Sequence, residues 1–272
     1  MKYGLYLPNF ADFGDARVLV ELAQLAEESG WDGFFLWDHI ARPGAPPVVD
    51  PWVALAAVAM ATRRMRIGAL VTPLARRRPW KVARETVSLD RLSGGRLVFG
   101  AGLGSPGGAE SEWAAFGEEA DLRVRAEMLD EALEVLASLW SGEPFSHSGR
   151  HFPVRQAAFR PTALQSPRIP VWIAGYWPSR APLRRAARWD GVFPLFRDGP
   201  PHDVAQLREA VELVQSRRAP GAGPFDVVYC GEHAGGPEPY ARAGATWWLA
   251  RVAPDASLAR TRSLIAAGPP GS

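Results

Sequence analysis

The segment Gly94-Gly-Arg-Leu-Val-Phe-Gly-Ala-Gly-Leu-Gly104 combines a turn, a short apolar strand and a glycine-rich exit from that strand. Glycines at the C-terminal end of a strand permit positive φ and let a ligand approach main-chain N–H groups, a common way of holding nucleotide and flavin phosphates. The segment therefore predicts that a flat or phosphorylated molecule lies against this backbone. The surrounding fold decides which kind of molecule it is.

Gly102, Gly104 and Gly107 also match the dinucleotide-binding pattern GxGxxG. That fingerprint opens a helix directly after the first strand and is followed by an acidic residue about 20 positions later. Here the pattern follows roughly the fourth strand and runs into Pro106-Gly-Gly-Ala-Glu110. The sequence therefore disfavours a Rossmann domain.

The totals of the chain limit its partners. It has 272 residues, 31 basic and 29 acidic side chains and a net charge of +2, so no nucleic-acid-binding face is indicated. Cys230 is the only cysteine, which excludes an internal disulfide framework and a multi-cysteine metal site. The sequence has no signal-peptide pattern and no run of about 18 apolar residues, so we expect a cytoplasmic protein without membrane contact that acts on small molecules.

Short apolar runs alternate with amphipathic runs along the whole chain, as in parallel βα units. We predict strands at Tyr3–Pro8, Gly33–Trp37, Met65–Val71, Leu97–Ala101, Pro170–Ala174, Gly191–Leu195, Phe225–Tyr229 and Thr246–Leu249. We predict helices at Ala16–Ser29, Pro51–Thr62, Pro79–Leu92, Leu122–Trp140, Arg180–Trp189, Asp203–Ser216, Pro237–Ala243 and Leu258–Ala266. Eight units favour an α/β fold of the (β/α)8 TIM-barrel type, a single domain over residues 1–272, rather than a doubly wound sheet.

The interval between the predicted strands 4 and 5 is too long for one crossover. An insertion is therefore expected at about residues 105–168, with a β-hairpin turning at Ser148-Gly149. His147 and His151 flank this turn. Four-residue spacing brings two histidines to one metal only on a helix, so the hairpin predicts no metal site here.

Reactive side chains of a TIM barrel lie at the C-terminal ends of its strands. Asp38-His39 follows the apolar run Phe34-Phe-Leu-Trp37, which places a titrating imidazole at the barrel mouth. Such a histidine is suited to proton transfer near neutral pH. The alternative is that Asp38 caps the next turn and that His39 satisfies loop carbonyls.

Two further segments carry groups that suit an anion. Gly175-Tyr176-Trp177-Pro178-Ser179-Arg180 places a glycine, a hydroxyl and a guanidinium at a helix start, where a phosphate is favoured. Plain capping by Ser179 and packing of the two aromatic rings would explain the same residues. Arg76-Arg77-Arg78 follows the third strand and suits an anionic tail of a cofactor or cosubstrate, although a solvated loop is the more usual reading of such a run.

The segments Tyr3–Asn9, Ala26–His39, Leu89–Gly104, Glu112–Gly117 and Ile169–Gly175 together resemble the bacterial luciferase-like flavin-dependent oxidoreductases. The resemblance covers nearly the whole chain in order. It implies a TIM barrel that binds FMN or the deazaflavin coenzyme F420 in its C-terminal mouth and carries out hydride or electron transfer at the ring.

The resemblance also implies roles for individual residues. A non-proline cis peptide is expected about Leu70-Val71-Thr72, beneath the ring, and the glycine segment Gly102-Leu103-Gly104 is expected beside it. The cofactor phosphate is expected at Gly175 to Arg180. Asp38 and His39 look like the pair found after the second strand of F420-dependent members, which makes His39 the predicted catalytic residue and Asp38 a cofactor neighbour.

Several alternatives remain open at this stage. With FMN, reaction with oxygen would make the protein a monooxygenase, and a barrel without catalytic activity is a further reading. Leu103 stands where some F420-dependent sugar-phosphate dehydrogenases carry an acid, which argues against that activity. No lysine stands at a predicted strand end, which disfavours an aldolase. Similar proteins often dimerise, so we expect a homodimer.

Overall fold

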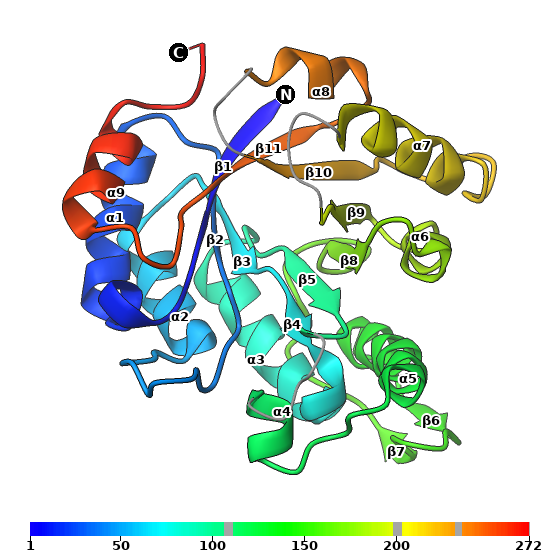
Figure 1. The fold of residues 1–272 in the computed structure, drawn as a ribbon. Coiled ribbons are helices and arrows are strands. Elements are labelled where there is room, and N and C mark those ends of the chain that lie inside the picture. The colour runs from blue at the N-terminus through cyan, green and yellow to red at the C-terminus, as the bar shows by residue number, and fades with distance from the viewer. Residues whose placement is uncertain (106–110, 198–202, 232–235, 272) are drawn as a thin grey trace.

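The computed structural model describes residues 1–105, 111–197, 203–231 and 236–271. Its central feature is a sheet of short parallel strands surrounded by helices (Figure 1). The strands of this sheet are β1 (Lys2–Leu7), β2 (Gly33–Leu36), β3 (Arg66–Ala69), β4 (Thr72–Pro73), β5 (Phe99–Gly102), β8 (Val171–Tyr176), β9 (Gly191–Leu195), β10 (Asp226–Gly231) and β11 (Trp247–Arg251).

The sheet is nearly closed into a barrel. Its strand order is β3-β2-β1-β11-β10-β9-β8-β5-β4. The two ends meet where Ile67 bridges Leu97 in parallel and the Val98 N–H donates to the Ile67 carbonyl over 2.9 Å. β3 and β4 follow each other directly and together form the third barrel position. The nine strands therefore fill eight positions, and the prediction of a TIM barrel is confirmed.

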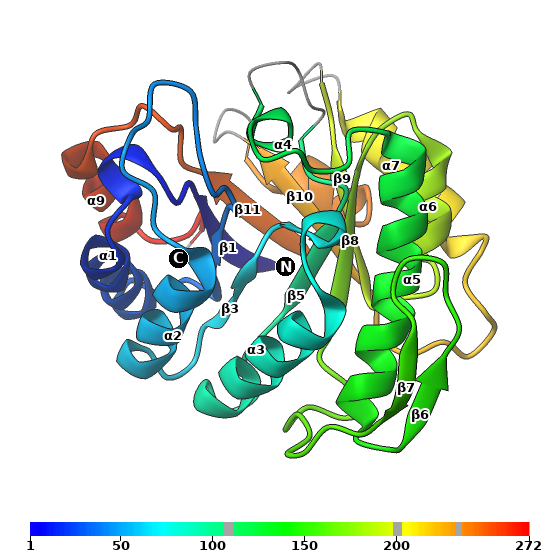
Figure 2. The ribbon, with the colours of Figure 1, turned by 90° about the horizontal axis from the view of Figure 1, so that it is seen from below.

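The helices cover the outside of the barrel (Figure 2). They are α1 (Ala16–Glu28), α2 (Pro51–Ala61), α3 (Pro79–Leu92), α5 (Leu122–Ser141), α6 (Arg180–Ala186), α7 (Asp203–Gln215), α8 (Glu238–Arg242) and α9 (Leu258–Ala266). Asp50 caps α2 by accepting from the N–H groups of Trp52 and Val53, as its place before Pro51 predicts. Within the described residues, no helix is both long and apolar enough to cross a membrane.

The long connection between β5 and β8 contains two helices and two strands. The short helix α4 (Glu112–Ala115) comes first, and α5 then packs against α3, where the Trp140 indole donates to the Thr86 hydroxyl over 2.9 Å. The strands β6 (Phe145–His147) and β7 (Val154–Ala157) form an antiparallel hairpin beside α5. The predicted hairpin is confirmed, while α5 takes the ordinary helix position after β5.

Side chains alternate between the inside and the outside of the barrel along each strand. On β11, Trp247 and Leu249 belong to the inner cluster, whereas Trp248 and Ala250 pack outward against the helices. The other buried members of the inner cluster are Phe35, Leu70, Val98, Trp172, Ala174, Phe193 and Val228. The ring centroids of Trp172 and Trp247 lie 5.3 Å apart, so aromatic rings fill the middle of the barrel, below its mouth.

Candidate active site at the barrel mouth

The barrel mouth is lined by the last inward-facing residue of several strands. Tyr6, Val71, Leu195 and Cys230 are partly buried and pack on top of the inner cluster. The rings of Tyr6 and Trp37 lie 5.5 Å apart between centroids. Burial raises the pKa of the Cys230 thiol to about 12, so this cysteine is a neutral thiol and no activated nucleophile.

Asn9 fixes the backbone that carries His39. Its side chain is fully buried, and its amide nitrogen donates to the carbonyl oxygens of His39 and Val49, each over 2.8 Å. Its amide oxygen accepts from the His39 N–H over 3.2 Å. The sequence indicated only that Asn9 lies at the end of the first strand. Its role in holding the loop after β2 depends on contacts 30 and 40 residues away.

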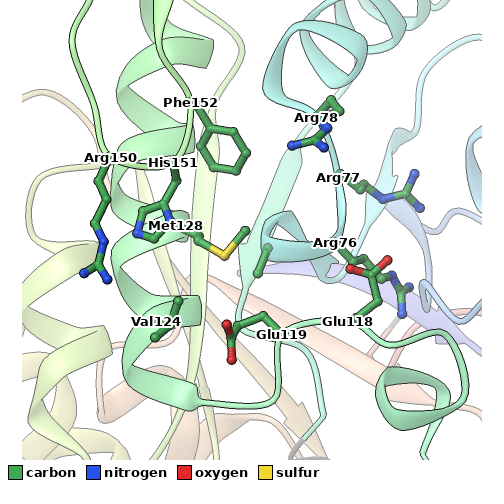
Figure 3. Close-up of a pocket in the computed structure, with 11 residues that line it drawn as sticks. Arg76, Arg77, Arg78, Glu118, Glu119, Val124, Met128, Arg150, His151 and Phe152 are labelled. Carbon is green, nitrogen blue, oxygen red and sulfur yellow. The ribbon is translucent and has the colours of Figure 1, made fainter.

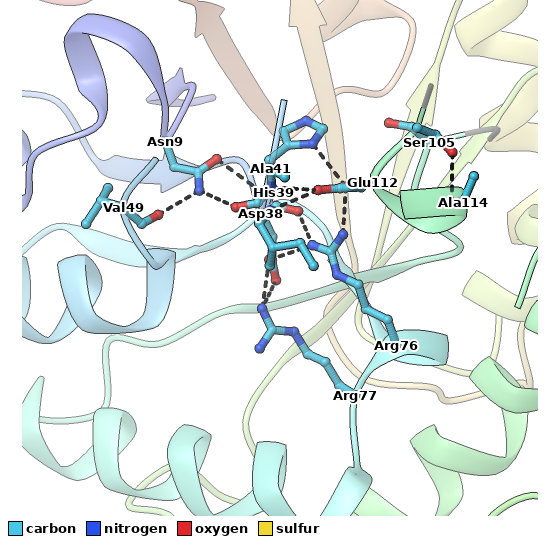
Figure 4. A network of polar contacts seen from close by, with 12 residues as sticks. Asn9, Asp38, His39, Ala41, Val49, Arg76, Arg77, Ser105, Glu112 and Ala114 are labelled. Carbon is cyan, nitrogen blue, oxygen red and sulfur yellow. Dashed lines mark hydrogen bonds and ion pairs between the residues drawn. The ribbon is translucent and has the colours of Figure 1, made fainter. Parts of the chain in front are cut away.

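The His39 ring is bound by a carboxylate (Figure 4) and lies beside two aromatic rings. Its Nδ1 lies 3.1 Å from Oε1 of Glu112, and the rings of Phe10 and Trp37 lie 5.6 and 6.0 Å away. An ionised carboxylate only accepts hydrogen bonds, so Nδ1 carries a proton and the neutral ring keeps its lone pair on Nε2. The side chain is 13% exposed, so the ring is not fully buried.

Glu112 is a further residue of the candidate site that the sequence did not indicate. Burial by itself would raise the pKa of Glu112. The hydrogen bond from His39, the charge of Arg76 and the N–H of Ile40 outweigh it and lower the pKa to about 2. Glu112 is therefore ionised at neutral pH. In the sequence Glu112 stands out only as part of the segment Glu112–Gly117, which carries the family resemblance. Its distance of 73 residues from His39 gives no local signal that the two side chains meet.

Asp38 forms ion pairs with two arginines next to the His39–Glu112 pair. Its carboxylate is fully buried and accepts from Arg76 over 2.9 Å and from Arg77 over 2.7 and 2.8 Å. Arg76 also forms an ion pair of 2.6 Å with Glu112. We call Asp38, His39, Arg76, Arg77 and Glu112 the polar cluster (Figure 4).

The reading of the arginine run as a solvated loop is corrected by these contacts. Only Arg78 is exposed, whereas the Arg76 and Arg77 side chains are 3% and 16% exposed. The reading of Asp38 as a turn cap is likewise replaced by its pairing with both arginines. Direct contact of Asp38 with a cofactor stays a prediction.

The predicted cis peptide is present between Leu70 and Val71, at the break between β3 and β4. Thr72 follows it, is fully buried, and its hydroxyl has no hydrogen-bond partner in the described part of the chain. Thr72 is in register with Ala101, whose side chain packs in the outer core, and contact of Leu70, Val71 and Thr72 with a cofactor stays a prediction.

The glycines at the end of β5 and just after it are required by the protein's own packing. A Cβ on Gly102 would lie 2.7 Å from Val71 Cγ2. Gly104 has φ +78° and its Cβ would lie 2.5 Å from the Trp113 ring. The glycine pattern therefore admits the Leu70–Val71 segment and Trp113. Contact of Gly102, Leu103 and Gly104 with a cofactor stays a prediction, and Gly107 lies outside the described residues.

The segment from Gly175 to Arg180 is arranged as a strand end and helix start. A Cβ on Gly175 would lie 2.2 Å from the Pro182 side chain, so this glycine lets α6 approach β8. Ser179 stands at the N-cap of α6 without making a side-chain capping bond. Trp177 packs against the outer core, while Tyr176 is 39% exposed. The proposed phosphate contacts of Ser179 and Arg180 stay predictions.

A separate cavity of about 590 Å³ lies on the outer side of the arginine run (Figure 3). Its walls are residues 75–78, Glu118 and Glu119, the start of α5, and the hairpin turn at Arg150–Phe152. Arg76 and Arg77 of the polar cluster line it, whereas none of Tyr6, Val71, Leu195 and Cys230 does. His147 and His151 lie beside Glu131 and Glu127, and the described residues contain no cluster that could hold a metal ion.

The barrel with a polar cluster at its C-terminal mouth defines a class of TIM-barrel enzymes that work on ligands held above the strands. A family model described as luciferase-like monooxygenase matches residues 1–263. The chain belongs to this family.

Relatives and solved structures agree with this assignment. The chain is 33% identical over 171 residues to an F420-dependent glucose-6-phosphate dehydrogenase of Gordonia bronchialis, covering 60% of this chain and 48% of the relative. An F420-dependent hydroxymycolic acid dehydrogenase of Mycobacterium tuberculosis is 32% identical over 184 residues, 66% of this chain and 49% of the relative. The chain thus spans about half the length of the curated relatives it matches.

Among solved structures, an F420-dependent secondary alcohol dehydrogenase matches with a TM-score of 0.76 at 17% identity, covering 99% of this chain and 98% of that one. A monooxygenase from Streptomyces bottropensis matches with a TM-score of 0.73 at 21% identity, covering 98% of both chains. These two similarities support the barrel fold.

Proposed function

We propose that this protein is an oxidoreductase that uses F420 or FMN and transfers hydride to or from a small organic substrate. His39 moves the accompanying proton. The observation that carries the proposal is the polar cluster, in which the His39 imidazole is bound through Nδ1 and has no Nε2 partner among the described residues, at the mouth of a luciferase-like barrel. The similarity to F420-dependent relatives supports F420, and the similarity to monooxygenases supports FMN.

The mouth fits a planar redox ring. Its floor is partly buried and largely apolar, formed by Tyr6, Val71 and Leu195, which suits the face of an aromatic ring. When bound, such a cofactor supplies a ring that accepts or donates a hydride. Gly175 to Arg180 would hold its phosphate.

His39 carries the transferred proton, and Glu112 orients and stabilises the His39 ring. Glu112, ionised and paired with Arg76, keeps the Nδ1 proton in place and stabilises the imidazolium that forms when Nε2 takes a proton. In the opposite direction, Nε2–H donates its proton to the substrate oxygen. Phe10 and Trp37 hold the plane of the ring, and Asn9 holds its backbone.

The test begins with cofactor binding. The purified protein is incubated with F420 or FMN and desalted, and its absorbance spectrum is recorded. We expect one of the two to remain bound. If neither binds, the protein is a barrel without this redox chemistry. If FMN binds, transfer of an oxygen atom from O2 to an added organic substrate in the presence of reduced FMN would identify a monooxygenase instead of a hydride-transferring enzyme.

The role of His39 is tested separately. His39→Ala should lower turnover by roughly 10²- to 10⁴-fold while cofactor affinity stays near that of the wild type. His147→Ala is the matched control, because His147 lies in the hairpin beside Glu131. Unchanged turnover in His39→Ala would remove this residue from the mechanism.

We further propose a homodimer that forms through α2. Val53 and Met60 lie seven residues apart on one face of this helix and are 65% and 70% exposed. A helix that is apolar on all sides is normally covered. A second copy of the chain, presenting the same face, is the expected cover.

A further inference from the structure

Two arginines, one just after β9 and one at the end of β11, continue the inward-facing rows of their strands at the barrel mouth. Arg251 is the last residue of β11 and lies in register with Tyr6 of β1. Because Trp247 and Leu249 face the inside, alternation directs Arg251 inward as well. Arg197 follows β9 by two residues and continues the inward series of Phe193 and Leu195.

Each of these arginines rests on an aromatic ring. The Arg251 guanidinium lies 5.5 Å from the Trp37 ring centroid, and the Arg197 guanidinium lies 5.2 Å from that of Tyr176. A ring face orients a guanidinium without using its N–H donors, so the donors stay available for a carboxylate or a phosphate.

Neither arginine has an acidic partner in the described residues. Both are exposed and neither forms an ion pair or hydrogen bond there. The two acids of the polar cluster are already engaged, because Asp38 is paired with Arg76 and Arg77 and Glu112 with Arg76.

The groups beneath Arg251 do not neutralise it. Burial raises the pKa of the Tyr6 phenol and of the Cys230 thiol, and the positive charge of Arg251 opposes the shift in both. Both groups therefore stay neutral at physiological pH. The opposing effect also places the Arg251 charge within electrostatic reach of the floor of the mouth, which leaves this side of the mouth positively charged.

We propose that Arg251, together with Arg197, binds a carboxylate or phosphate group of the substrate and so restricts the enzyme to anionic substrates. Trp37 touches both Arg251 and the His39 ring. The anionic group therefore lies one side chain away from the atom that moves the proton, and the reacting carbon is directed toward His39. This inference rests on the proposed function and assigns the substrate class of the same site.

Inorganic phosphate is the probe for this site, and its binding is measured by isothermal titration calorimetry. Arg251→Gln should weaken phosphate binding at least about tenfold, because it removes a charged hydrogen-bond donor. Arg251→Lys keeps the charge and should retain part of the affinity. Arg155→Gln, at an exposed arginine on β7, is the matched control and should bind phosphate like the wild type. Equal affinity in the wild type and Arg251→Gln would overturn the proposal.

The source of the anionic group is tested in the cofactor-saturated protein. If Arg251 serves the substrate, phosphate still binds after F420 or FMN has filled the mouth, and Arg251→Gln retains the cofactor after desalting. Loss of phosphate binding on saturation would mean that the cofactor phosphate occupies Arg251, which overturns the substrate assignment. Failure of both cofactors to bind would instead refute the proposed function, so the two failures are distinguishable.

Discussion

Replacing Glu112 with Gln tests whether the polar cluster depends on an ionised carboxylate. The pKa of Glu112 is about 2 in the folded protein and 4.5 in its ordinary state, because His39 and Arg76 outweigh the effect of burial. A carboxyl group whose pKa is lower in the folded state stabilises the fold above pH 4.5, and this stabilisation is lost as the pH falls toward 2. From pH 7 to pH 3 the wild type should lose about 2 kcal/mol through this group.

The Gln side chain does not titrate, so the variant loses none of this contribution. At pH 7 it should unfold more easily by about 3 kcal/mol, because the buried Arg76 loses one of its two carboxylate partners. At pH 3 the difference from the wild type should narrow to about 1 kcal/mol, since the wild type has lost the part that depends on ionisation.

Urea unfolding at both pH values, followed by the fluorescence of the 11 tryptophans, measures these differences. Glu21→Gln is the control, because Glu21 is 63% exposed in its ion pair with Arg262. Its difference from the wild type should be the same at pH 7 and pH 3. A stability gap for Glu112→Gln that does not change between the two pH values would refute an ionised Glu112 in the cluster.

Three further predictions concern other parts of the chain. Gly104→Ala should cost about 2–4 kcal/mol of unfolding free energy in urea melts, from positive φ and the Trp113 contact, whereas Gly117→Ala, also at positive φ but in open space, should cost only about 1 kcal/mol. Equal costs would show that Trp113 does not require the glycine. Cys230 should react with a disulfide reagent at pH 8 roughly fiftyfold more slowly in the native protein than in urea, because its pKa is raised to about 12; equal rates would contradict that shift. Met60→Glu should convert the proposed dimer to a monomer in sedimentation velocity, and an unchanged sedimentation coefficient would exclude this face of α2 as the interface.

The fold was largely predictable because its signals are local. Alternating apolar runs, Pro51 after the Asp50 cap, and the turn at Ser148-Gly149 each act within a few residues of sequence, and the structure confirms them. The predicted helix from Arg180 ends earlier than expected, at Ala186. Helix ends of this kind depend on packing against β8 and α7 and are therefore less predictable.

The candidate site was predictable only in part. Asp38-His39 was recognised because it directly follows an apolar strand, a pattern visible within one segment. Asn9, Arg76 and Glu112 were not assigned to it, because they reach His39 and Asp38 across 30 to 73 residues of sequence. The sequence predicts that Gly102 and Gly104 make room for a ligand. In the structure, Gly102 makes room for Val71 and Gly104 makes room for Trp113.

The sequence by itself determined the barrel architecture and the place of a titrating histidine at a strand end, because periodicity and strand termination are local properties of the chain. Only the tertiary structure decided which charges meet. It paired Asp38 with Arg76 and Arg77, set Glu112 against His39, and left Arg197 and Arg251 without an acidic partner among the described residues. Such pairings depend on barrel closure, which brings loops from distant parts of the chain to one mouth, and electrostatic interactions act through that distance in space.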